Sequence, residues 1–210
     1  MGEVIGITGG IGSGKSIICK IFSILGVPIY EADSRAKWLI THNLSLKASI
    51  VQLLGENAYK SNGDYHREWV ASEVFNNPDL LLQLNALVHP AVHQDAREWI
   101  ANNQHYSFVL YEAALMKAAG NGSFFDKVIV VTCPLALRIQ RVKERDKRSL
   151  EEIEAIIARQ IPEEERLKIA DYIIQNDEKT SLIEQVLDLY DLYNQFSNKD
   201  SCIKKGNSDK

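Results

Sequence analysis

A glycine-rich segment near the start of the chain constrains the fold more than any other feature. Residues 9–16 read Gly9-Gly10-Ile11-Gly12-Ser13-Gly14-Lys15-Ser16, which is the pattern G-x-x-x-x-G-K-S. The apolar run 4–7 before it predicts a short buried strand, and the apolar run 17–25 after it predicts a buried helix that ends at Gly26. A strand, a glycine loop and a helix in this order are typical of a loop that binds nucleotide phosphates.

The residue types in this segment suit phosphate chemistry. Glycines let the backbone curl so that consecutive N–H groups point inward at phosphate oxygens, and the following helix adds the positive end of its dipole. Lys15 is expected to reach the β- and γ-phosphates, and the Ser16 hydroxyl is expected to bind Mg²⁺. The predicted ATP-binding residues of this loop are Gly9, Gly10, Ile11, Gly12, Ser13, Gly14, Lys15, Ser16 and Ile17.

Composition excludes several other classes of function. The chain has 210 residues and a net charge of −4, so no global basic field attracts nucleic acid. Cys19, Cys133 and Cys202 lie far apart and form no zinc pattern, which fits a reduced cytoplasmic setting. No signal peptide is visible and no stretch approaches a membrane span. We therefore expect a cytoplasmic protein with no membrane or nucleic-acid partner, acting as a monomer or a weak homo-oligomer.

Strand-like and helical patterns alternate along the chain, which predicts an α/β fold whose parallel sheet has helices on both faces. The strand-like runs are 3–8, 27–30, 106–111, 127–132 and 171–174. The second and third runs are too far apart for one crossover helix, so residues 35–105 are predicted to form a helical insertion. Asn77-Pro78 predicts a helix start, and His89-Pro90 predicts another break.

The core and the chain end can also be placed. Residues 1–34, 106–136 and 169–197 are expected to form the nucleotide-binding core. The last helix carries Leu182, Ile183, Val186, Leu187, Tyr190 and Tyr193 on the face that we expect to pack on that core. From Asn198 the chain is polar, so residues 198–210 are expected to form a disordered tail.

The second predicted strand is followed by carboxylates at Glu31 and Asp33. In a parallel sheet its carboxyl end shares an edge with the phosphate loop, so Asp33 can face the γ-phosphate region. There it could accept a proton from a hydroxyl group or hold Mg²⁺ through water. Asp33 followed by Ser34 and Arg35 also suits the N-cap of a helix. Spacing alone leaves both roles open.

Several segments, in order, closely resemble the dephospho-coenzyme A kinase family. They are 6–16, Leu25-Gly26-Val27-Pro28, Ala32-Asp33, Asn85-Ala86-Leu87-Val88-His89-Pro90, Arg141 to Asp146, Arg159-Gln160 and 170–177. The resemblance implies a P-loop kinase that transfers the γ-phosphate of ATP to the ribose 3′-hydroxyl of dephospho-CoA. It also implies that 35–105 binds the CoA substrate and that 137–168 forms a helical lid.

The resemblance also implies roles for individual residues. Asp33 matches the general base and Thr8 lies near the acceptor, while Lys15 and Ser16 keep their phosphate and Mg²⁺ roles. Arg141 and Arg145 match lid arginines that act on the transferring phosphate, where a planar, permanently charged guanidinium is suited. The alternative for both arginines is a solvated charged helix.

The resemblance assigns three further residues, and the end of a predicted strand adds a fourth candidate. Asn176 and Asp177 match a loop that lies against the adenine of ATP, although an ordinary polar turn is the alternative. His89 matches a residue of the substrate-binding part and could instead cap a helix. Glu112, which ends the third predicted strand, is a candidate carboxylate for Mg²⁺.

Residues 114–118 depart from the family pattern, because Ala118 stands where the family has a glutamate. Any role of that glutamate in substrate binding is lost or moved here. A kinase for a nucleoside or nucleotide acceptor would share the loop and the carboxylate. A regulatory ATP-binding module is the alternative from another class. The sequence has no guanine-recognition motif of the Asn-Lys-x-Asp kind, which argues against a GTPase, and only Glu112 comes close to the strand-ending Asp of a transport or motor ATPase.

Overall fold

The computed structural model describes residues 2–75, 77–114 and 125–204, with side chains described as far as residue 194. The contacts divide the chain into two compact units. We call them the sheet unit, which comprises residues 1–30 and 102–210, and the helical unit, which comprises residues 31–101. The departing segment 115–118 lies outside the described residues.

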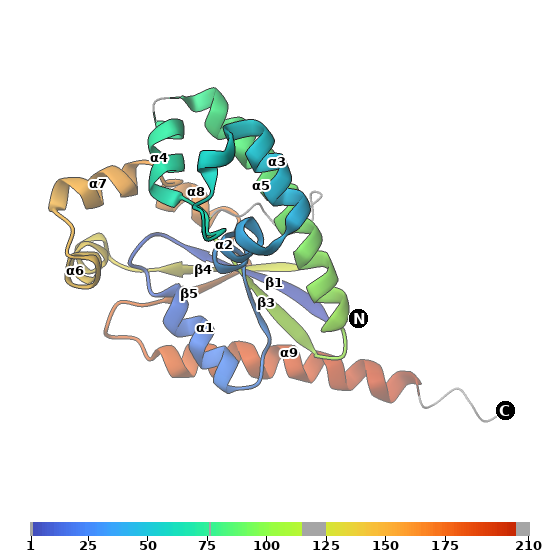
Figure 1. The fold of residues 1–210 in the computed structure, drawn as a ribbon. Helices are drawn as coiled ribbons and strands as arrows, with labels where there is room; N and C mark the ends of the chain where they lie inside the picture. Colours follow the sequence, from blue (N-terminus) through green and yellow to red (C-terminus); the bar gives the residue numbers. More distant parts are fainter. Residues whose placement is uncertain (1, 76, 115–124, 205–210) are drawn as a thin grey trace. The chain divides into compact units, whose positions relative to one another are not determined.

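A five-stranded sheet forms the centre of the sheet unit, in the order β2-β3-β1-β4-β5 (Figure 1). β1 pairs in parallel with β3 and β4, and β4 pairs in parallel with β5. The strands are β1 (Glu3–Gly9), β2 (Ile29–Glu31), β3 (Phe108–Glu112), β4 (Lys127–Thr132) and β5 (Tyr172–Gln175). The predicted α/β class and all five strand positions are confirmed, and the phosphate loop follows the central strand.

The described residues of the sheet unit form five helices, with α1 and α9 on one face of the sheet (Figure 1). Phe22 of α1 and Val186 of α9 are fully buried in one apolar cluster with Ile5, Ile7 and Ile129 of the strands. Burying this face is the main stabilising contribution, at about 25 cal/mol per Å² of apolar surface. The helices are α1 (Lys15–Ile24), α6 (Leu135–Asp146), α7 (Leu150–Ala158), α8 (Glu163–Leu167) and α9 (Leu182–Lys204).

The helical unit contains four α-helices and a short 3-10 helix among its described residues. They are α2 (Ala32–His42), α3 (Leu44–Leu54), η1 (Glu56–Ala58), α4 (Arg67–Phe75) and α5 (Pro78–Asn102). α5 begins as predicted, because the Asn77 side chain accepts a hydrogen bond from Leu80 N at 3.0 Å and Pro78 is its first residue. Arg35 of α2 forms an ion pair with Asp95 of α5, with Nε 2.9 Å from Oδ2.

Three sequence expectations about helix ends are wrong. His89-Pro90 does not break the chain, since α5 continues through Pro90 to Asn102. Asp33 is not a helix cap, because the N-cap of α2 is Glu31 and Asp33 lies inside the first turn. α9 continues to Lys204, so residues 198–204 are helical where a tail without structure was expected.

The buried face of α9 also differs in part from the expected one. Val186 and Tyr193 are buried and Leu182 and Tyr190 pack against the core, as expected. Ile183 and Leu187, however, are 60% and 39% exposed, and Leu189 is buried instead. No helix among the described residues is both long and apolar enough to cross a membrane.

Candidate phosphate-transfer site

The glycine loop turns between Gly9, the last residue of β1, and Lys15, the first residue of α1. Gly12 and Gly14 have φ angles of 76° and 92°, a region that residues with a Cβ atom rarely adopt. The loop is closed by hydrogen bonds from Ser13 N to Gly10 O and from Ile17 N to Gly14 O, both 3.1 Å. The helix starts earlier than the apolar pattern predicted, so Lys15, Ser16 and Ile17 form its first turn.

Lys15 lies inside this loop. Its Nζ donates a hydrogen bond to the carbonyl oxygen of Gly9 at 3.0 Å and lies 3.9 Å from Oε1 of Glu112. The side chains of Lys15 and Glu112 are only 14% and 16% exposed. Ser16 is exposed at the start of α1. An ammonium group, a carboxylate and a hydroxyl therefore gather around the loop, at the carboxyl ends of β1 and β3.

Thr8 precedes the loop on β1 and is almost fully buried. Its Oγ1 donates a hydrogen bond to the carbonyl oxygen of Ala114 at 3.2 Å. The hydroxyl therefore ties the central strand to the segment that follows β3. This contact gives Thr8 a structural role beside the acceptor role expected for it.

Asn176 holds the phosphate loop from the end of β5. Its Nδ2 donates a hydrogen bond to the carbonyl oxygen of Ser13 at 2.8 Å, and its Oδ1 accepts one from Arg141 Nη2 at 3.2 Å. A Cβ atom on Gly14 would lie 2.1 Å from Nδ2, so only glycine fits there. Asn176, expected to contact adenine, thus uses its amide to support the loop.

Arg141 of α6 is held by several partners. Besides Asn176, its Nη2 contacts Glu178 Oε1 at 3.0 Å and its Nη1 donates toward Cys133 Sγ at 3.3 Å. Burial raises the pKa of the Cys133 thiol, although the Arg141 and Arg138 guanidiniums oppose that rise. The structure therefore brings Arg141 to the phosphate loop through Asn176.

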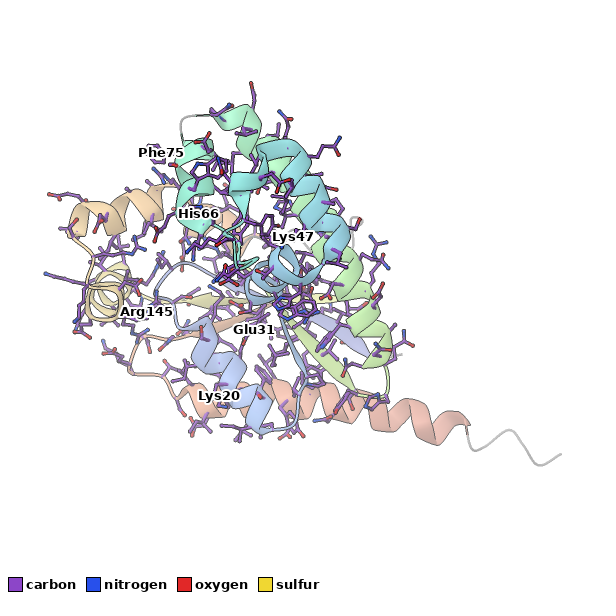
Figure 2. The ribbon with its side chains drawn as sticks, in the orientation of Figure 1. Lys20, Glu31, Lys47, His66, Phe75 and Arg145 are labelled. Atoms are coloured by element: carbon purple, nitrogen blue, oxygen red, sulfur yellow. The ribbon has the colours of Figure 1, made fainter. Side chains whose placement is uncertain are left out.

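Arg145 and Asp177 have separate surroundings. Arg145 is 63% exposed at the end of α6, and its Nε contacts Asp146 Oδ1 at 2.7 Å (Figure 2). Asp177 accepts hydrogen bonds within its own turn, from Lys179 N at 3.0 Å and Thr180 N at 2.8 Å, and these bonds lower the pKa of its carboxyl group. The geometry of Asp177 is that of a polar turn, the alternative considered for it.

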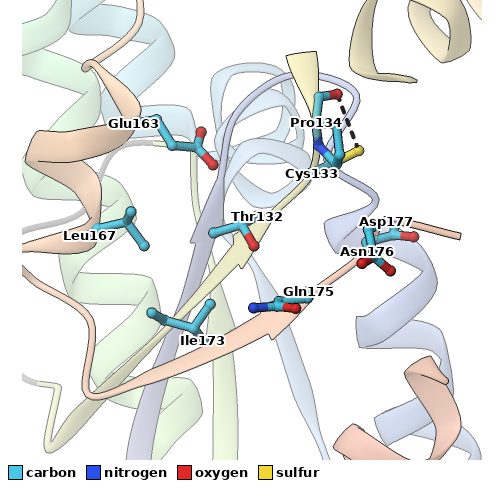
Figure 3. Close-up of a pocket in the computed structure, with 9 residues that line it drawn as sticks. All are labelled: Thr132, Cys133, Pro134, Glu163, Leu167, Ile173, Gln175, Asn176 and Asp177. Carbon is cyan, nitrogen blue, oxygen red and sulfur yellow. Dashed lines mark hydrogen bonds between the residues drawn. The ribbon is translucent and has the colours of Figure 1, made fainter. Parts of the chain in front are cut away.

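A pocket of about 440 Å³ opens at the carboxyl ends of β4 and β5, beside α8 (Figure 3). Leu167 and Ile173 give it apolar walls, and Thr132, Glu163 and Gln175 add polar groups. Its remaining lining residues are Cys133, Pro134, Asn176 and Asp177. Since Asn176 also bonds to the phosphate loop, the pocket and the loop share a residue.

Two predicted site residues belong to the helical unit. Asp33 lies in the first turn of α2, directly after β2, and its side chain is exposed. His89 is exposed in the middle of α5 and does not cap a helix. The roles of both residues stay predictions.

Sequence reasoning missed two residues that contact the loop. Arg138 Nε donates a hydrogen bond to the carbonyl oxygen of Ile11 at 3.0 Å, and Gln160 Oε1 accepts one from Ile11 N at 2.9 Å. The sequence contained only a weak indication that Arg138 has a special role. Arg138 lies four residues before the buried Val142 on the same face of α6, where an apolar side chain is usual.

Known proteins match the chain over most of its length. A family model described as "CoaE: Dephospho-CoA kinase" matches residues 3–181. The dephospho-CoA kinase of Pasteurella multocida is 36% identical over 203 residues, covering 94% of this chain and 98% of that protein. The dephospho-CoA kinase of Porphyromonas gingivalis is 36% identical over 184 residues, covering 87% and 90%.

Solved structures show the same fold. The crystal structure of TT1252 from Thermus thermophilus superposes with a TM-score of 0.78 at 30% identity, covering 90% of this chain and 96% of that one. Dephospho-CoA kinase from Campylobacter jejuni superposes with a TM-score of 0.66 at 29% identity, covering 91% and 96%. From the family match, the relatives and the phosphate loop together, we conclude that this chain belongs to the dephospho-CoA kinase family, whose members are ATP-dependent phosphotransferases.

Proposed function

We propose that the chain transfers the γ-phosphate of ATP to the ribose 3′-hydroxyl of dephospho-CoA, giving CoA and ADP. The observation that carries this proposal is the family match over residues 3–181, which includes both the phosphate loop and the whole helical unit. The loop alone would support only nucleotide binding, because many unrelated activities use the same fold. The helical unit supplies the part that distinguishes one acceptor from another.

ATP binds with its phosphates in the loop of residues 9–17, where backbone N–H groups and the start of α1 favour negative charge. Lys15 moves from the Gly9 carbonyl to the β- and γ-phosphates. This requires little movement, because its Nζ already lies within the loop. The ammonium group then neutralises charge that spreads over the transferring phosphate.

Mg²⁺ is part of the proposal, and the residues present fit it. The Ser16 hydroxyl and the Glu112 carboxylate are the hard oxygen donors that Mg²⁺ prefers, with phosphate oxygens and water completing the shell. Bound there, the ion would offset charge on the β- and γ-phosphates. Changing Glu112 to Gln should raise the Mg²⁺ concentration needed for half-maximal rate, and an unchanged Mg²⁺ dependence would remove Glu112 from the site.

Asp33 orients the 3′-hydroxyl and accepts its proton. Asp33 lies exposed in the first turn of α2, and a carboxylate can accept a proton as a general base. His89 contacts the CoA substrate from α5, and Thr8 supports the strand beside the acceptor. Residues outside the phosphate loop therefore take part in recognising the acceptor.

Arg141 and Arg145 form part of the lid of residues 137–168. Arg141 already contacts Asn176, so a small change of side-chain torsions would bring its guanidinium to the nucleotide. Arg145 first has to break its ion pair with Asp146. This ion pair contributes little stability, because the Arg145 side chain is largely exposed. Closing the lid excludes water, which would otherwise compete as the phosphate acceptor.

The cellular compartment and the oligomeric state are also part of the proposal. We propose that the enzyme acts in the cytoplasm as a monomer or weak homo-oligomer. Cys19 and Cys133 are both buried, as expected of small apolar side chains in a reducing compartment.

The direct test follows ADP release by the purified protein with ATP, Mg²⁺ and dephospho-CoA, using adenosine and AMP as control acceptors. We expect ADP in proportion to the dephospho-CoA added, with CoA as the product. Turnover with a control acceptor alone would keep the phosphate chemistry and discard this acceptor. ATP binding without acceptor-dependent turnover would favour a regulatory module.

A further inference from the structure

Both backbone groups of Ile11, in the middle of the phosphate loop, are held by the segment that carries α6 and α8. The N–H of Ile11 donates to Gln160 Oε1 at 2.9 Å, and its carbonyl oxygen accepts from Arg138 Nε at 3.0 Å. These two side chains lie far apart in sequence from Ile11 and from each other. Their contacts therefore fix the loop from outside its own turn.

The Arg138 side chain is the more deeply buried of the two, with only 7% of it exposed. Its guanidinium lies against Gly10, where an added Cβ atom would be 2.3 Å from Nη2. A Cβ atom on Gly12 would lie 2.5 Å from the carbonyl oxygen of Arg138. Two of the loop glycines are therefore required because Arg138 packs directly against them.

Arg138 belongs to a charge cluster in which one partly exposed carboxylate lies between two buried guanidiniums. Glu163 Oε2 lies 3.2 Å from Arg138 Nη1 and 3.3 Å from Arg166 Nη1. Burial lowers the pKa of Arg166 while Glu163 opposes that change, and an arginine stays charged in any case. The neighbouring Arg141 has its own carboxylate in Glu178. The ion pairs among the described residues thus leave this cluster with one surplus positive charge.

Arg166 also fixes the segment that carries Gln160. Its Nη2 donates a hydrogen bond to the carbonyl oxygen of Ile161 at 2.9 Å, and its side chain is 3% exposed. One cluster thereby orients Arg138 and holds the residue next to Gln160. Such a buried arrangement gives fixed geometry, because each member is satisfied only in this position.

We propose that Arg138 and Gln160 are positioning residues that hold Ile11 in the conformation that binds ATP, and that the surplus charge beside the loop strengthens phosphate binding. Glu163 and Arg166 keep the Arg138 guanidinium in place. The proposal rests on ATP binding at this loop and is independent of the acceptor. It predicts loss of affinity for ATP and for pyrophosphate at the loop, with no change in KM for dephospho-CoA.

The experiment measures calorimetric affinity for ATP and for inorganic pyrophosphate, together with KM for each substrate. Arg138→Met should weaken ATP binding about ten- to a hundredfold, the range for a lost hydrogen bond to a charged group. Arg138→Lys should recover part of this, since it keeps the charge and loses the planar fork. Gln160→Leu should weaken ATP binding about three- to tenfold. KM for dephospho-CoA should stay at the wild-type value in all three variants.

Lys127→Met is the matched control. Lys127 carries the same charge in the same unit, but it begins β4, at the amino end of the strand, and pairs with Asp171 at 3.2 Å. Its loss should leave both ATP and pyrophosphate affinity unchanged. If Lys127→Met weakens binding as much as Arg138→Met, the effect is one of overall charge and the proposal is wrong.

Unchanged ATP affinity in a folded Arg138→Met protein would overturn the proposal. An equal rise in KM for both substrates would also overturn it, because that pattern indicates a structural role alone. If Arg138→Met does not fold, Arg138→Lys and Gln160→Leu provide the test. Their double variant should lose less ATP-binding free energy than the two single variants lose together, because both residues act on Ile11. Wild-type protein that binds ATP without phosphorylating dephospho-CoA would refute the proposed acceptor and leave this test intact.

Discussion

The two units are stabilised in different ways. In the sheet unit, Ile5, Ile7 and Ile129 have no exposed surface, and the loop after β1 is held by the buried Arg138 and Asn176. In the helical unit each helix buries only a few residues, and large apolar side chains stay exposed, Leu44 at 82% and Phe75 at 75%. Polar contacts between helices, such as Arg35 with Asp95, add to its stability.

This difference matches the demands of the two halves of the reaction. Phosphate transfer needs groups fixed to within a fraction of an ångström, which a fully packed sheet provides. Recognition of a long acceptor tolerates more movement, and elements with fewer buried contacts open locally at lower cost. We therefore expect changes in the sheet unit to affect ATP and changes in the helical unit to affect the acceptor.

The largest effect is expected from Asp33→Asn. The amide cannot accept the proton of the 3′-hydroxyl, so kcat should fall by about a hundredfold to ten-thousandfold. ATP affinity, measured by calorimetry, should stay at the wild-type value because the phosphate loop is untouched. Near-normal turnover would remove Asp33 as the base. Glu31→Gln, two residues earlier at the exposed cap of the same helix, serves as the matched carboxylate control.

Glycine substitutions compare the two units directly. The φ angle is near 90° at Gly14, Gly26 and Gly55. Replacing any of them by alanine should therefore introduce the same backbone strain and destabilise the fold by about 1 kcal/mol or more. Only Gly14 would place its Cβ against another group, 2.1 Å from Asn176 Nδ2, while Gly26 and Gly55 face open space. Gly14→Ala should abolish measurable ATP binding, and the other two should only lower the melting temperature. Equal effects in all three would show that the loop is not held by Asn176.

Asp95→Ala tests the helical unit. It leaves the Arg35 guanidinium without its bidentate partner and should destabilise that unit by about 1–3 kcal/mol. Hydrogen exchange should speed up in α2 and α5, with KM for dephospho-CoA rising and ATP affinity preserved. Glu98→Ala, on an exposed turn of the same helix, is the control and should change neither. Faster exchange in the strands would contradict independent stabilisation of the units.

The smallest effect concerns pH and the start of β1. Burial, followed by repulsion from Asp126, raises the pKa of Glu3, and one of its carboxylate oxygens is buried without a hydrogen-bond partner. Its ionised form therefore destabilises the fold above the raised pKa, and this penalty disappears as pH falls toward the ordinary glutamate pKa of 4.5. Glu3→Gln should raise the melting temperature slightly at pH 7 and leave it unchanged near pH 4. A constant difference across this range would exclude ionisation as the cause.

The sequence predicted the sheet well, because period and composition report burial directly. The runs that became β3 and β4 are almost continuously apolar, as strands buried on both faces must be, and the glycine pattern located the phosphate loop. The α5 start was predictable because its cap is local, made by Asn77 and Pro78. Local chemistry of this kind is visible in a short window of sequence.

Long-range support for the loop was not predictable in the same way. Arg138, Gln160 and Asn176 contact the loop only through the tertiary fold. The sequence signals were the family resemblance at Gln160 and Asn176 and the helix face that Arg138 shares with Val142, and none of them indicated a contact with the loop. His89-Pro90 misled for the opposite reason. Pro90 suggests a break locally, but α5 buries Val88 and Val92 on either side of it, and that packing outweighs the lost hydrogen bond.

The central place of β1 has a consequence for synthesis. β1 is made before its partners, which are residues 108–112 and 127–131, and the loop that follows it contacts Arg138, Gln160 and Asn176. While the nascent chain is being translated, the nucleotide motif emerges early but has nothing to pair with. The ability to capture ATP should therefore arise only after most of the chain has left the ribosome. Chains that stall at residue 130 would carry the whole motif without a working site.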